Sequence, residues 1–246
     1  MKPSWNAPPT QLLFSGKDVH IWQAVLDLPS IRVQELKENL SIDERIKSEH
    51  FRFERDRSQF IAAHGILRRI LGCYLGVEPG AIRFCYEKRG KPRLQNAFAK
   101  TGIRFNLSHS KGLALYVFTR GHEAGIDIEF IREMSEMEQI AEQFFSVRDR
   151  VFLGALPRSE KMEAFFKLWT QKEAFVKATG AGLSNPSDTS DVSVAPGKLL
   201  ELLRIFGTTQ EGPKWSMWEV MPDEEFASAV VVEGESWEVQ YWQWPV

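Results

Sequence analysis

The sequence predicts an α+β protein made of two halves, each of which pairs helices with an antiparallel sheet. Two observations support this fold class. Strand-like stretches rich in apolar residues occur in both halves, and each half also contains a long amphipathic helical stretch. The chain has 246 residues, of which 43% are hydrophobic and 26% are charged, so it is long enough to bury a substantial core.

The expected elements follow one another as strand, helices and strands, and then as helices and strands again. A boundary near residues 121–124 divides the chain into 1–120 and 121–246. The first half contains a strand at 19–28, helical sequence at 31–53, an amphipathic helix at 56–76, and strands at 81–87, 102–110 and 112–120. The second half contains a strand at 124–130, three helices within 136–179 separated at Gly154 and Pro157, and strands at 191–195, 199–206, 214–220, 226–234 and 237–244.

The composition argues against nucleic-acid or membrane binding as the main function. The formal net charge is −2, so any basic site must be local. No run approaches the ~18 apolar residues that span a bilayer, and the first residues lack the apolar core of a signal peptide. The two cysteines, Cys73 and Cys85, show neither metal-ligand spacing nor a disulfide framework. We therefore expect a cytoplasmic protein.

Residues 125–129, G-I-D-I-E, place two carboxylates on one face of a predicted strand. Asp127 and Glu129 project from the same side, whereas the two isoleucines point to the other side, into the core. Neighbouring carboxylates repel each other and favour a cation, and hard oxygen ligands suit Mg²⁺. For this pattern alone, the exposed polar face of a half-buried strand is the commoner explanation.

Residues 105–110, F-N-L-S-H-S, end a predicted strand in polar side chains. Asn106, Ser108 and Ser110 share one face, and together with His109 they could donate several hydrogen bonds to a phosphate or a ribose. Turn chemistry is the alternative, because serine and asparagine favour such positions. A Ser-His nucleophile pair is disfavoured, since adjacent residues on a strand point apart.

The loop 88–94, K-R-G-K-P-R-L, concentrates positive charge around a glycine-proline turn. A basic loop with an unhindered glycine can approach a polyphosphate closely, although solvated charge in a turn is the commoner explanation. The loop matches neither a P-loop nor a dinucleotide-binding fingerprint.

The stretch 165–183 is amphipathic, but some of its charged residues lie on the apolar side. At about 100° per residue, Lys172 falls inside the apolar arc, and Glu173 and Lys177 lie on its margin. Ala174 occupies a position expected to face solvent. Glu173 and Lys177 are one helical turn apart, so both can reach one site, and Lys172 could extend along the core to a phosphate.

The sequence resembles the 4′-phosphopantetheinyl transferase family in four motifs that occur in the expected order. These are G-K-P (90–92), F-N-L-S-H-S (105–110), G-I-D-I-E (125–129) and W-T-Q-K-E-A-F-V-K (169–177), the last followed by G-A-G-L. The similarity is greatest to the large Sfp-type branch, whose single chain behaves as a pseudo-dimer, and it covers roughly residues 40–190. It implies two similar halves related by a pseudo-two-fold axis, with the active site between them.

The resemblance implies an enzyme that moves the phosphopantetheine arm of coenzyme A to a serine of an apo acyl or peptidyl carrier protein. Adenosine 3′,5′-bisphosphate would be released, and Mg²⁺, or alternatively Mn²⁺, would be the metal. By resemblance, Asp127 and Glu173 hold this metal, with Glu129 as a third ligand. Glu173 is also the expected general base. Lys177 would contact the phosphates and stabilise the departing bisphosphate.

The resemblance also implies a coenzyme A-binding set drawn from all four motifs and from one upstream helix. Its members are Lys47, Arg89, Gly90, Lys91, Asn106, Ser108, His109, Asp127 and Lys177. The branch often has basic residues at two places near Lys47. Here Glu44 fills one of these places, and the neighbouring Arg45 could substitute for the missing charge.

The carrier-docking surface is expected over residues 144–162 and in the loop after Gly182. Carrier proteins are typically acidic, so the basic residues of this stretch could steer their approach. These residues are Arg148, Arg150, Arg158 and Lys161. The alternatives for the carrier are proteins of fatty-acid, polyketide, nonribosomal-peptide or lysine biosynthesis.

We expect the enzyme to act as a monomer. Two other classes of function could use the same residues. One alternative is a non-catalytic coenzyme A- or nucleotide-binding module. The other is a Mg²⁺-dependent phosphohydrolase. A nuclease of that class should carry a broad basic surface, which a sequence pI near 6.3 does not favour.

Overall fold

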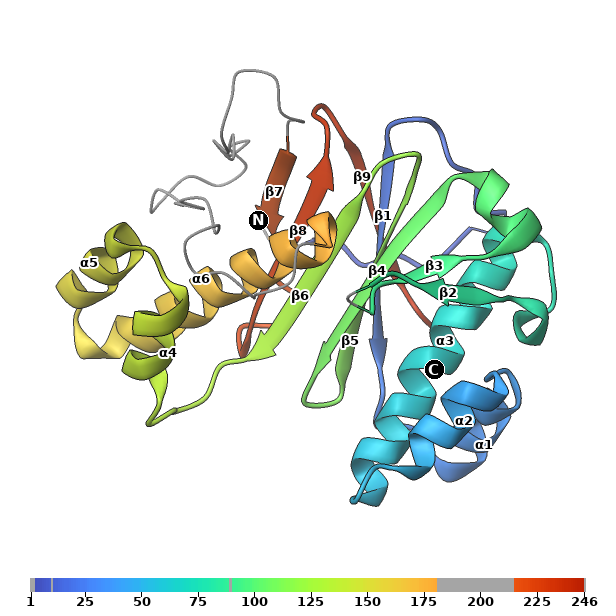
Figure 1. The fold of residues 1–246 in the computed structure, drawn as a ribbon, viewed down its shortest axis with the longest axis horizontal. Coiled ribbons are helices and arrows are strands. Elements are labelled where there is room, and N and C mark those ends of the chain that lie inside the picture. The colour runs from blue at the N-terminus through green and yellow to red at the C-terminus, as the bar shows by residue number, and fades with distance from the viewer. Residues whose placement is uncertain (1–2, 10, 89, 181–214, 246) are drawn as a thin grey trace.

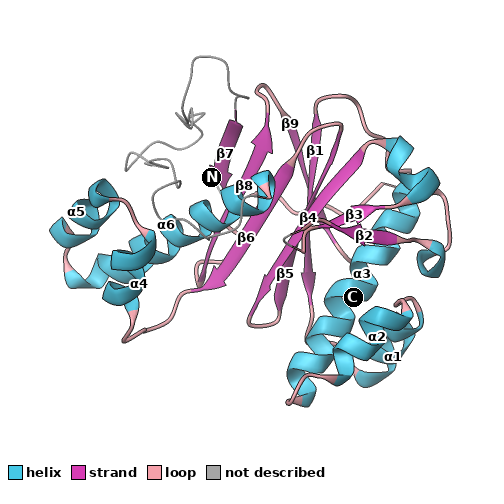
Figure 2. Cartoon of the chain, in the orientation of Figure 1, coloured by secondary structure: helices cyan, strands magenta, loops and turns pink. Residues whose placement is uncertain are grey.

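Two sheets pack face to face at the centre of the molecule, and a long helix covers the outer face of each sheet (Figure 1). The computed structural model describes residues 3–9, 11–88, 90–180 and 215–245. Among these residues, no helix combines the length and the apolar composition needed to cross a membrane. The architecture is α+β, as the sequence predicts (Figure 2).

The elements of the first half are β1 (Asp18–Val25), α1 (Ser30–Glu38), α2 (Ile42–Glu49), α3 (Glu54–Leu75), η1 (Pro79–Ala81), β2 (Phe84–Tyr86), β3 (Pro92–Leu94), η2 (Asn96–Thr101), β4 (Ile103–Ser110) and β5 (Leu113–Arg120). Those of the second half are β6 (Ala124–Phe130), α4 (Met137–Phe144), α5 (Val147–Ala155), α6 (Arg158–Thr179), β7 (Trp215–Glu219), β8 (Phe226–Glu233) and β9 (Glu238–Gln243).

The first sheet has the strand order β4-β5-β1-β9, and α3 covers its outer face. Alternate residues of β1 serve the two faces of the sheet, as the period of two in a strand requires. Trp22 and Ala24 pack toward α3, where they meet Ile66 and Ile70. Val19 and Ile21, which lie on the opposite face of the strand, face the second sheet.

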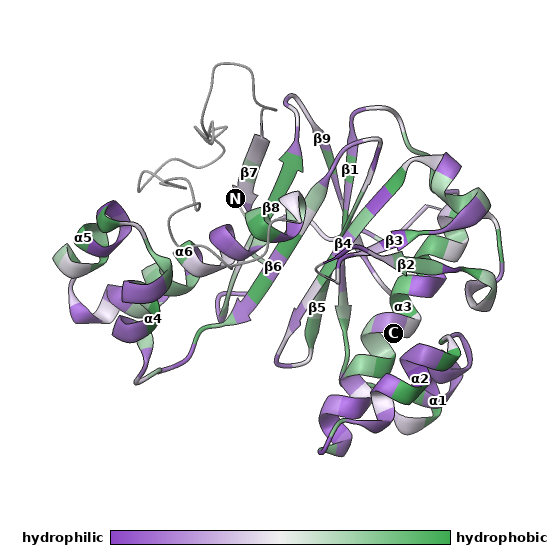
Figure 3. Cartoon of the chain, viewed as in Figure 1, coloured by the Kyte–Doolittle hydropathy of each residue, from purple (hydrophilic) through white to green (hydrophobic). Residues whose placement is uncertain are grey.

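The second sheet has the strand order β6-β8-β7 and is antiparallel throughout. Its inner face meets the inner face of the first sheet in one apolar cluster. Figure 3 colours much of β6 and β8 as hydrophobic. Val19, Ile21, Leu115, Val117, Ile126, Ile128, Val230 and Val232 form the centre of this cluster, and all are fully buried. The two isoleucines of G-I-D-I-E therefore point into the core, as predicted, and the two carboxylates point away from it.

The last strand returns to the first sheet, where β9 runs parallel to β1 with Asp18 opposite Glu238. The first sheet is therefore mixed rather than purely antiparallel. The division of the chain at 120/121 remains a prediction, and the C-terminal strand lies in the sheet formed by the first half.

The helices follow the predicted pattern with shifted ends. Three helices occupy 136–179, as expected, and the last two separate next to Pro157 as predicted. The separation expected at Gly154 is wrong, because Gly154 lies inside α5 and the first break follows Phe144, where Ser146 caps the start of α5. The helical stretch 31–53 contains the two short helices α1 and α2. The loop 88–94 differs from the prediction, because its last residues form β3 and pair with β2. The strands expected at 191–195 and 199–206 lie outside the described residues.

Candidate active site

Strands β4 and β6 lie side by side where the two sheets meet, and side chains of β4 join them. Asn106 Oδ1 accepts a hydrogen bond from the Ile126 amide at 3.0 Å, and Ser110 Oγ accepts one from the Phe130 amide at 3.1 Å. These contacts satisfy backbone donors of β6 on the side away from β8. The polar face of F-N-L-S-H-S thus fixes the strand that carries Asp127 and Glu129.

Helix α6 lies unusually close to β6 because Gly125 has no side chain. A Cβ at Gly125 would overlap the carbonyl oxygen of Ala174 and the amide nitrogen of Ala178, and would lie 2.9 Å from the Ala178 Cα. Ala174 and Ala178 are fully buried against the sheet. Glycine on the strand and alanine on the helix therefore permit the approach that carries Lys177 to β6.

One ion pair joins three of the predicted motifs. The Lys177 ammonium lies 2.6 Å from Asp127 Oδ1 and 2.9 Å from Ser108 Oγ, and Ser108 Oγ also donates to Asp127 Oδ1 at 2.8 Å. Asp127 is only 3% exposed, and its second oxygen, Oδ2, is buried without a donor among the described residues. A buried carboxylate oxygen without a donor is costly, unless a ligand or cation binds it.

Two further carboxyl groups border this ion pair. Glu129 accepts a hydrogen bond from Ser110 Oγ at 3.1 Å and lies 3.8 Å from Arg132. Burial raises the pKa of the Glu129 carboxyl, and the negative charge of Asp127 raises it further. Burial and the charge of Asp127 also raise the pKa of Glu173, while Lys177 opposes this rise. The three carboxylates therefore share one electrostatic environment that would favour an added cation.

The donors at this site fit a hard divalent cation. Carboxylate and hydroxyl oxygens are the available groups, and these are the ligands that Mg²⁺ and Mn²⁺ prefer. Among the described residues, no three His, Cys, Asp or Glu side chains are arranged closely enough to hold a metal ion. In this conformation the Lys177 ammonium is paired with Asp127 Oδ1.

A row of basic and aromatic side chains extends from this site along the first half. The packing of protein around the imidazole lowers the pKa of His109, and the charges of His64 and Lys177 lower it further. His64 lies against the Phe60 ring with a centroid separation of 4.2 Å, and the Lys47 ammonium lies 5.5 Å from the centre of the same ring. Lys47 and His109 are both exposed.

The upstream acidic residue has a structural role. Glu44 is buried and forms an ion pair of 2.7 Å with the buried Arg68 of α3, and it completes a capping box with Ser41 at the start of α2. Burial would raise the pKa of Glu44, but hydrogen bonding from His64 and the charge of Arg68 lower it to about 2. Arg45 donates to the carbonyl oxygens of Glu38 and Leu40.

The two described residues of the basic loop that belong to the predicted site, Gly90 and Lys91, lie in different environments. Gly90 has a φ of +86°, which favours glycine, and it closes the turn between β2 and β3. Arg89 lies outside the described residues. Lys91 is directed into the protein, where its ammonium contacts the junction of β6 and α6.

The prediction for Lys172 is wrong. Its ammonium forms a buried ion pair of 3.1 Å with Asp149 at the beginning of α5, and it lies 5.7 Å from the Phe145 ring centre, away from the carboxylates of β6. Ala174 is also buried rather than solvated. Both differences arise because α6 packs against the sheet on one side and against α5 on another, so a single apolar arc does not describe it.

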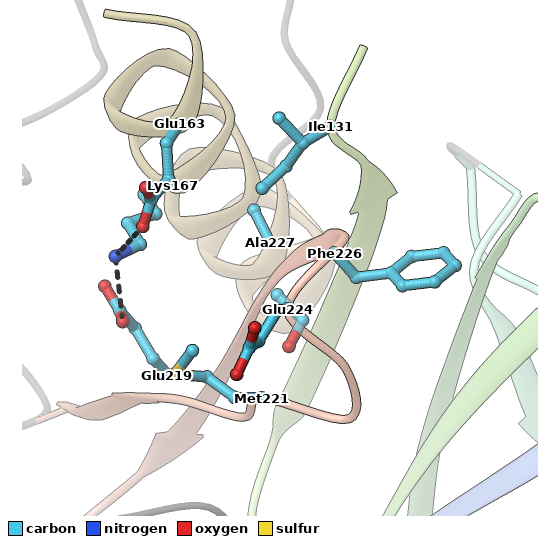
Figure 4. A pocket seen from close by; sticks show the side chains of 9 residues that line it. Ile131, Glu163, Lys167, Glu219, Met221, Glu224, Phe226 and Ala227 are labelled. Carbon is cyan, nitrogen blue, oxygen red and sulfur yellow. Dashed lines mark ion pairs between the residues drawn. The ribbon is translucent and has the colours of Figure 1, made fainter. Parts of the chain in front are cut away.

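A small hollow at the other end of α6 contains none of the predicted site residues (Figure 4). Ile131, Met221, Phe226 and Ala227 form its apolar lining, and Glu163, Glu219 and Glu224 add negative charge. The Lys167 ammonium lies 2.8 Å from Glu163 and 3.9 Å from Glu219, so these carboxylates already neutralise it. The hollow is therefore poorly suited to a phosphate.

The sequence is similar to known proteins over the segments that form this site. Residues 123–231, which include β6 and α6, match the model of the 4′-phosphopantetheinyl transferase superfamily. The chain is 39% identical over 244 residues to 4′-phosphopantetheinyl transferase HetI of Nostoc sp., covering 99% of this chain and 100% of HetI. The chain belongs to the 4′-phosphopantetheinyl transferase superfamily.

Two Bacillus enzymes show the same relationship over a shorter region. The chain is 30% identical over 153 residues to 4′-phosphopantetheinyl transferase Sfp of Bacillus subtilis, covering 62% of this chain and 66% of Sfp. It is 33% identical over 153 residues to psf-1 of Bacillus pumilus, covering 62% and 63% of the two chains. This 4′-phosphopantetheinyl transferase therefore transfers the phosphopantetheine group of coenzyme A to apo carrier proteins.

Sequence reasoning missed two residues that shape the site. Gly125 is the first residue of G-I-D-I-E, but its role depends on the helix that packs against it. Glu123, just before β6, accepts hydrogen bonds from Lys91, Arg93 and Arg104. Nothing in the local sequence pattern indicates this convergence, because the three partners come from β3, β4 and the loop before β3.

Proposed function

We propose that the transfer takes place at the site formed by β4, β6 and α6. The observation that carries this proposal is the contact of Lys177 with Asp127 and Ser108, which brings three motifs to one point. Glu129 and Glu173 border the same point. A site with three carboxylates and one lysine is suited to a diphosphate only when a cation is added.

Asp127, Glu129 and Glu173 would hold Mg²⁺ once their side chains move together, because in this conformation no three carboxylates of the described residues are close enough to share an ion. Mn²⁺ is the alternative with the same ligand preference. The donor-free oxygen of Asp127 and the mutual repulsion of the carboxylates support this assignment. The bound ion would neutralise charge on the diphosphate of coenzyme A during phosphoryl transfer.

The residues of the chain would perform the remaining steps. Glu173 accepts the proton of the carrier serine, directly or through water. The serine oxygen forms a bond to the phosphorus that carries the pantetheine arm. The bond from this phosphorus to the bridging oxygen breaks, and adenosine 3′,5′-bisphosphate leaves. Lys177 stabilises the negative charge on this leaving group.

Coenzyme A would extend from Lys177 along the row of His109, His64, Phe60 and Lys47. The exposed Lys47 and His109 offer charge and hydrogen bonds to the nucleotide phosphates, and Ser108 lies at the diphosphate end. Asn106 contributes by holding Ile126 in place. We also propose that Arg89 and Gly90, which belong to the loop 88–94, contact coenzyme A.

The carrier would dock on α5 in the second half, 121–246. Val147 and Val151 are 67% and 68% exposed on adjacent turns of this helix, next to Arg148 and Arg150. Exposed apolar side chains flanked by arginines suit an acidic partner with an apolar contact surface. The loop after Gly182 lies outside the described residues. We further propose that the enzyme is a cytoplasmic monomer.

One experiment tests the proposed role of Glu173. Purified enzyme, coenzyme A, Mg²⁺ and an apo carrier are incubated, and the carrier is weighed by mass spectrometry. Glu173→Gln should lose transfer while retaining measurable coenzyme A binding, because the amide keeps the shape but loses the charge. Glu163→Gln, on the same helix at 56% side-chain exposure, is the matched control and should remain active. Normal turnover by Glu173→Gln would refute the role.

The same assay separates the alternative functions. A carrier that gains the pantetheine arm indicates the transferase, release of free phosphate indicates a hydrolase, and no change indicates a binding module. Asp127, Glu173 and Lys177 are all present, and their convergence favours the catalytic interpretation over the binding module.

A further inference from the structure

The Lys91 ammonium is completely coordinated by the protein. It donates to the carbonyl oxygen of Ala178 at 2.9 Å, to the carbonyl oxygen of Ala124 at 3.1 Å and to Glu123 Oε2 at 3.1 Å. Its side chain is 6% exposed. An ammonium group has three N–H donors, and three acceptors are present, so none remains for a phosphate.

Two of these acceptors belong to the elements that form the active site. Ala124 begins β6, three residues before Asp127. Ala178 lies in the last turn of α6, directly after Lys177. Carbonyl oxygens in the last turn of a helix have no partner within the helix, so an external donor there stabilises the helix end.

Glu123 holds Lys91 in this position. Its Oε2 accepts from Lys91, and its Oε1 accepts from Arg93 at 2.7 Å and from Arg104 at 3.1 Å. The backbone amide of Glu123 donates to Glu233 of β8. Three basic residues of the first half therefore converge on one acidic residue at the start of the second half.

We propose that Lys91 and Glu123 are positioning residues that fix the C-terminal end of α6 over β6. The pair sets the distance of Lys177 and Glu173 from Asp127, and Lys91 does not itself bind a phosphate of coenzyme A. This inference rests on the proposed catalytic site, and it revises the role that family resemblance implies for Lys91. The close packing of Gly125 against Ala174 and Ala178 makes the site sensitive to small displacements of the helix.

The test compares Lys91→Met, Glu123→Gln and the double variant in the full-length enzyme. Lys91→Met removes all three donors at similar volume, and Glu123→Gln removes the charge while keeping the shape. We expect each single variant to lower kcat on the order of 10–100-fold, because small misplacements of reacting groups have effects of this size. The Michaelis constant for coenzyme A should change less than about threefold. The kcat of the double variant should be only slightly lower than that of either single variant, since each substitution disrupts the same Lys91–Glu123 contact.

Hydrogen exchange supplies a readout that does not depend on catalysis. Backbone amides in the last turn of α6 should exchange faster in both single variants, with the first turns of this helix unchanged. Lys100→Met, which removes an exposed lysine of η2, is the control and should leave both measurements unchanged. If Lys91→Met does not fold, Glu123→Gln carries the same two measurements.

A loss of coenzyme A affinity with unchanged kcat and unchanged exchange would overturn the proposal and restore Lys91 as a phosphate ligand. Unchanged kinetics in both single variants would also overturn it. Failure of the catalytic proposal is separate, because it would be seen as retained transfer by Glu173→Gln. The exchange result would then still decide whether Lys91 fixes α6.

Discussion

Gly125→Ala should lower activity more than a methyl group added at any other position of the second sheet. The new Cβ would overlap the Ala174 carbonyl oxygen and the Ala178 amide nitrogen, and would lie 2.9 Å from the Ala178 Cα. Carbon atoms in ordinary contact are about 3.5–4.0 Å apart, so the helix must retreat by roughly 1 Å. All three obstructing atoms belong to the backbone, and no side-chain rotation can relieve the overlap.

A retreat of about 1 Å would carry Glu173 and Lys177 away from Asp127, which stays on the strand. Misplacement of this size can lower turnover on the order of 100-fold. Overpacking of a tight interface typically costs about 1–3 kcal/mol of folding free energy. Gly125→Ala should therefore show a large fall in kcat in the carrier mass assay and a lower midpoint of urea unfolding.

Gly16→Ala is the matched control, in the turn before β1. Nothing lies within 4 Å of a Cβ at Gly16, and its φ is outside the left-handed region. This variant should be active, with an unfolding midpoint close to that of the wild type. If Gly125→Ala retains normal kcat and an unchanged unfolding midpoint, the close approach of α6 does not determine the geometry of the site.

Three further predictions concern other parts of the molecule. Burial lowers the pKa of His20 to about 4, against the opposing charge of Asp18, so the unfolded chain binds more protons between pH 4 and 6.5. About 3 kcal/mol of stability should be present above pH 6.5 and lost as the pH falls to 4. His20→Gln should flatten this dependence in urea unfolding measured across that range, and an equally steep slope in the variant would contradict the assignment. Removal of divalent metal with EDTA should abolish transfer, and added Mg²⁺ or Mn²⁺ should restore it; full activity in EDTA would exclude the proposed metal site. Charge reversal at Arg148 and Arg150 should raise the Michaelis constant for the carrier and leave coenzyme A affinity unchanged, and an unaltered carrier constant would remove α5 as the docking surface.

Much of the fold followed from patterns of period two and 3.6. Alternation in G-I-D-I-E predicted which residues face the core, and the structure agrees at Ile126 and Ile128. The helical wheel of α6 was less successful. It treated the helix as a surface element with one apolar side. The second sheet buries Ala174, and α5 gives Lys172 a buried partner, so neither residue lies where the wheel places it.

The sequence by itself determined the α+β class, the order of most helices and strands, and the kinds of side chain present in the four motifs. These properties depend on the spacing of apolar residues and on residue chemistry, and both can be read from the sequence without knowing how distant segments pack. Only the tertiary structure decided that the Lys91 ammonium donates its hydrogen bonds to Glu123 and two backbone carbonyl oxygens. The same holds for the contact of Lys177 with Asp127 and Ser108. Those contacts join residues far apart in the chain, and their geometry depends on how closely one helix can approach one strand.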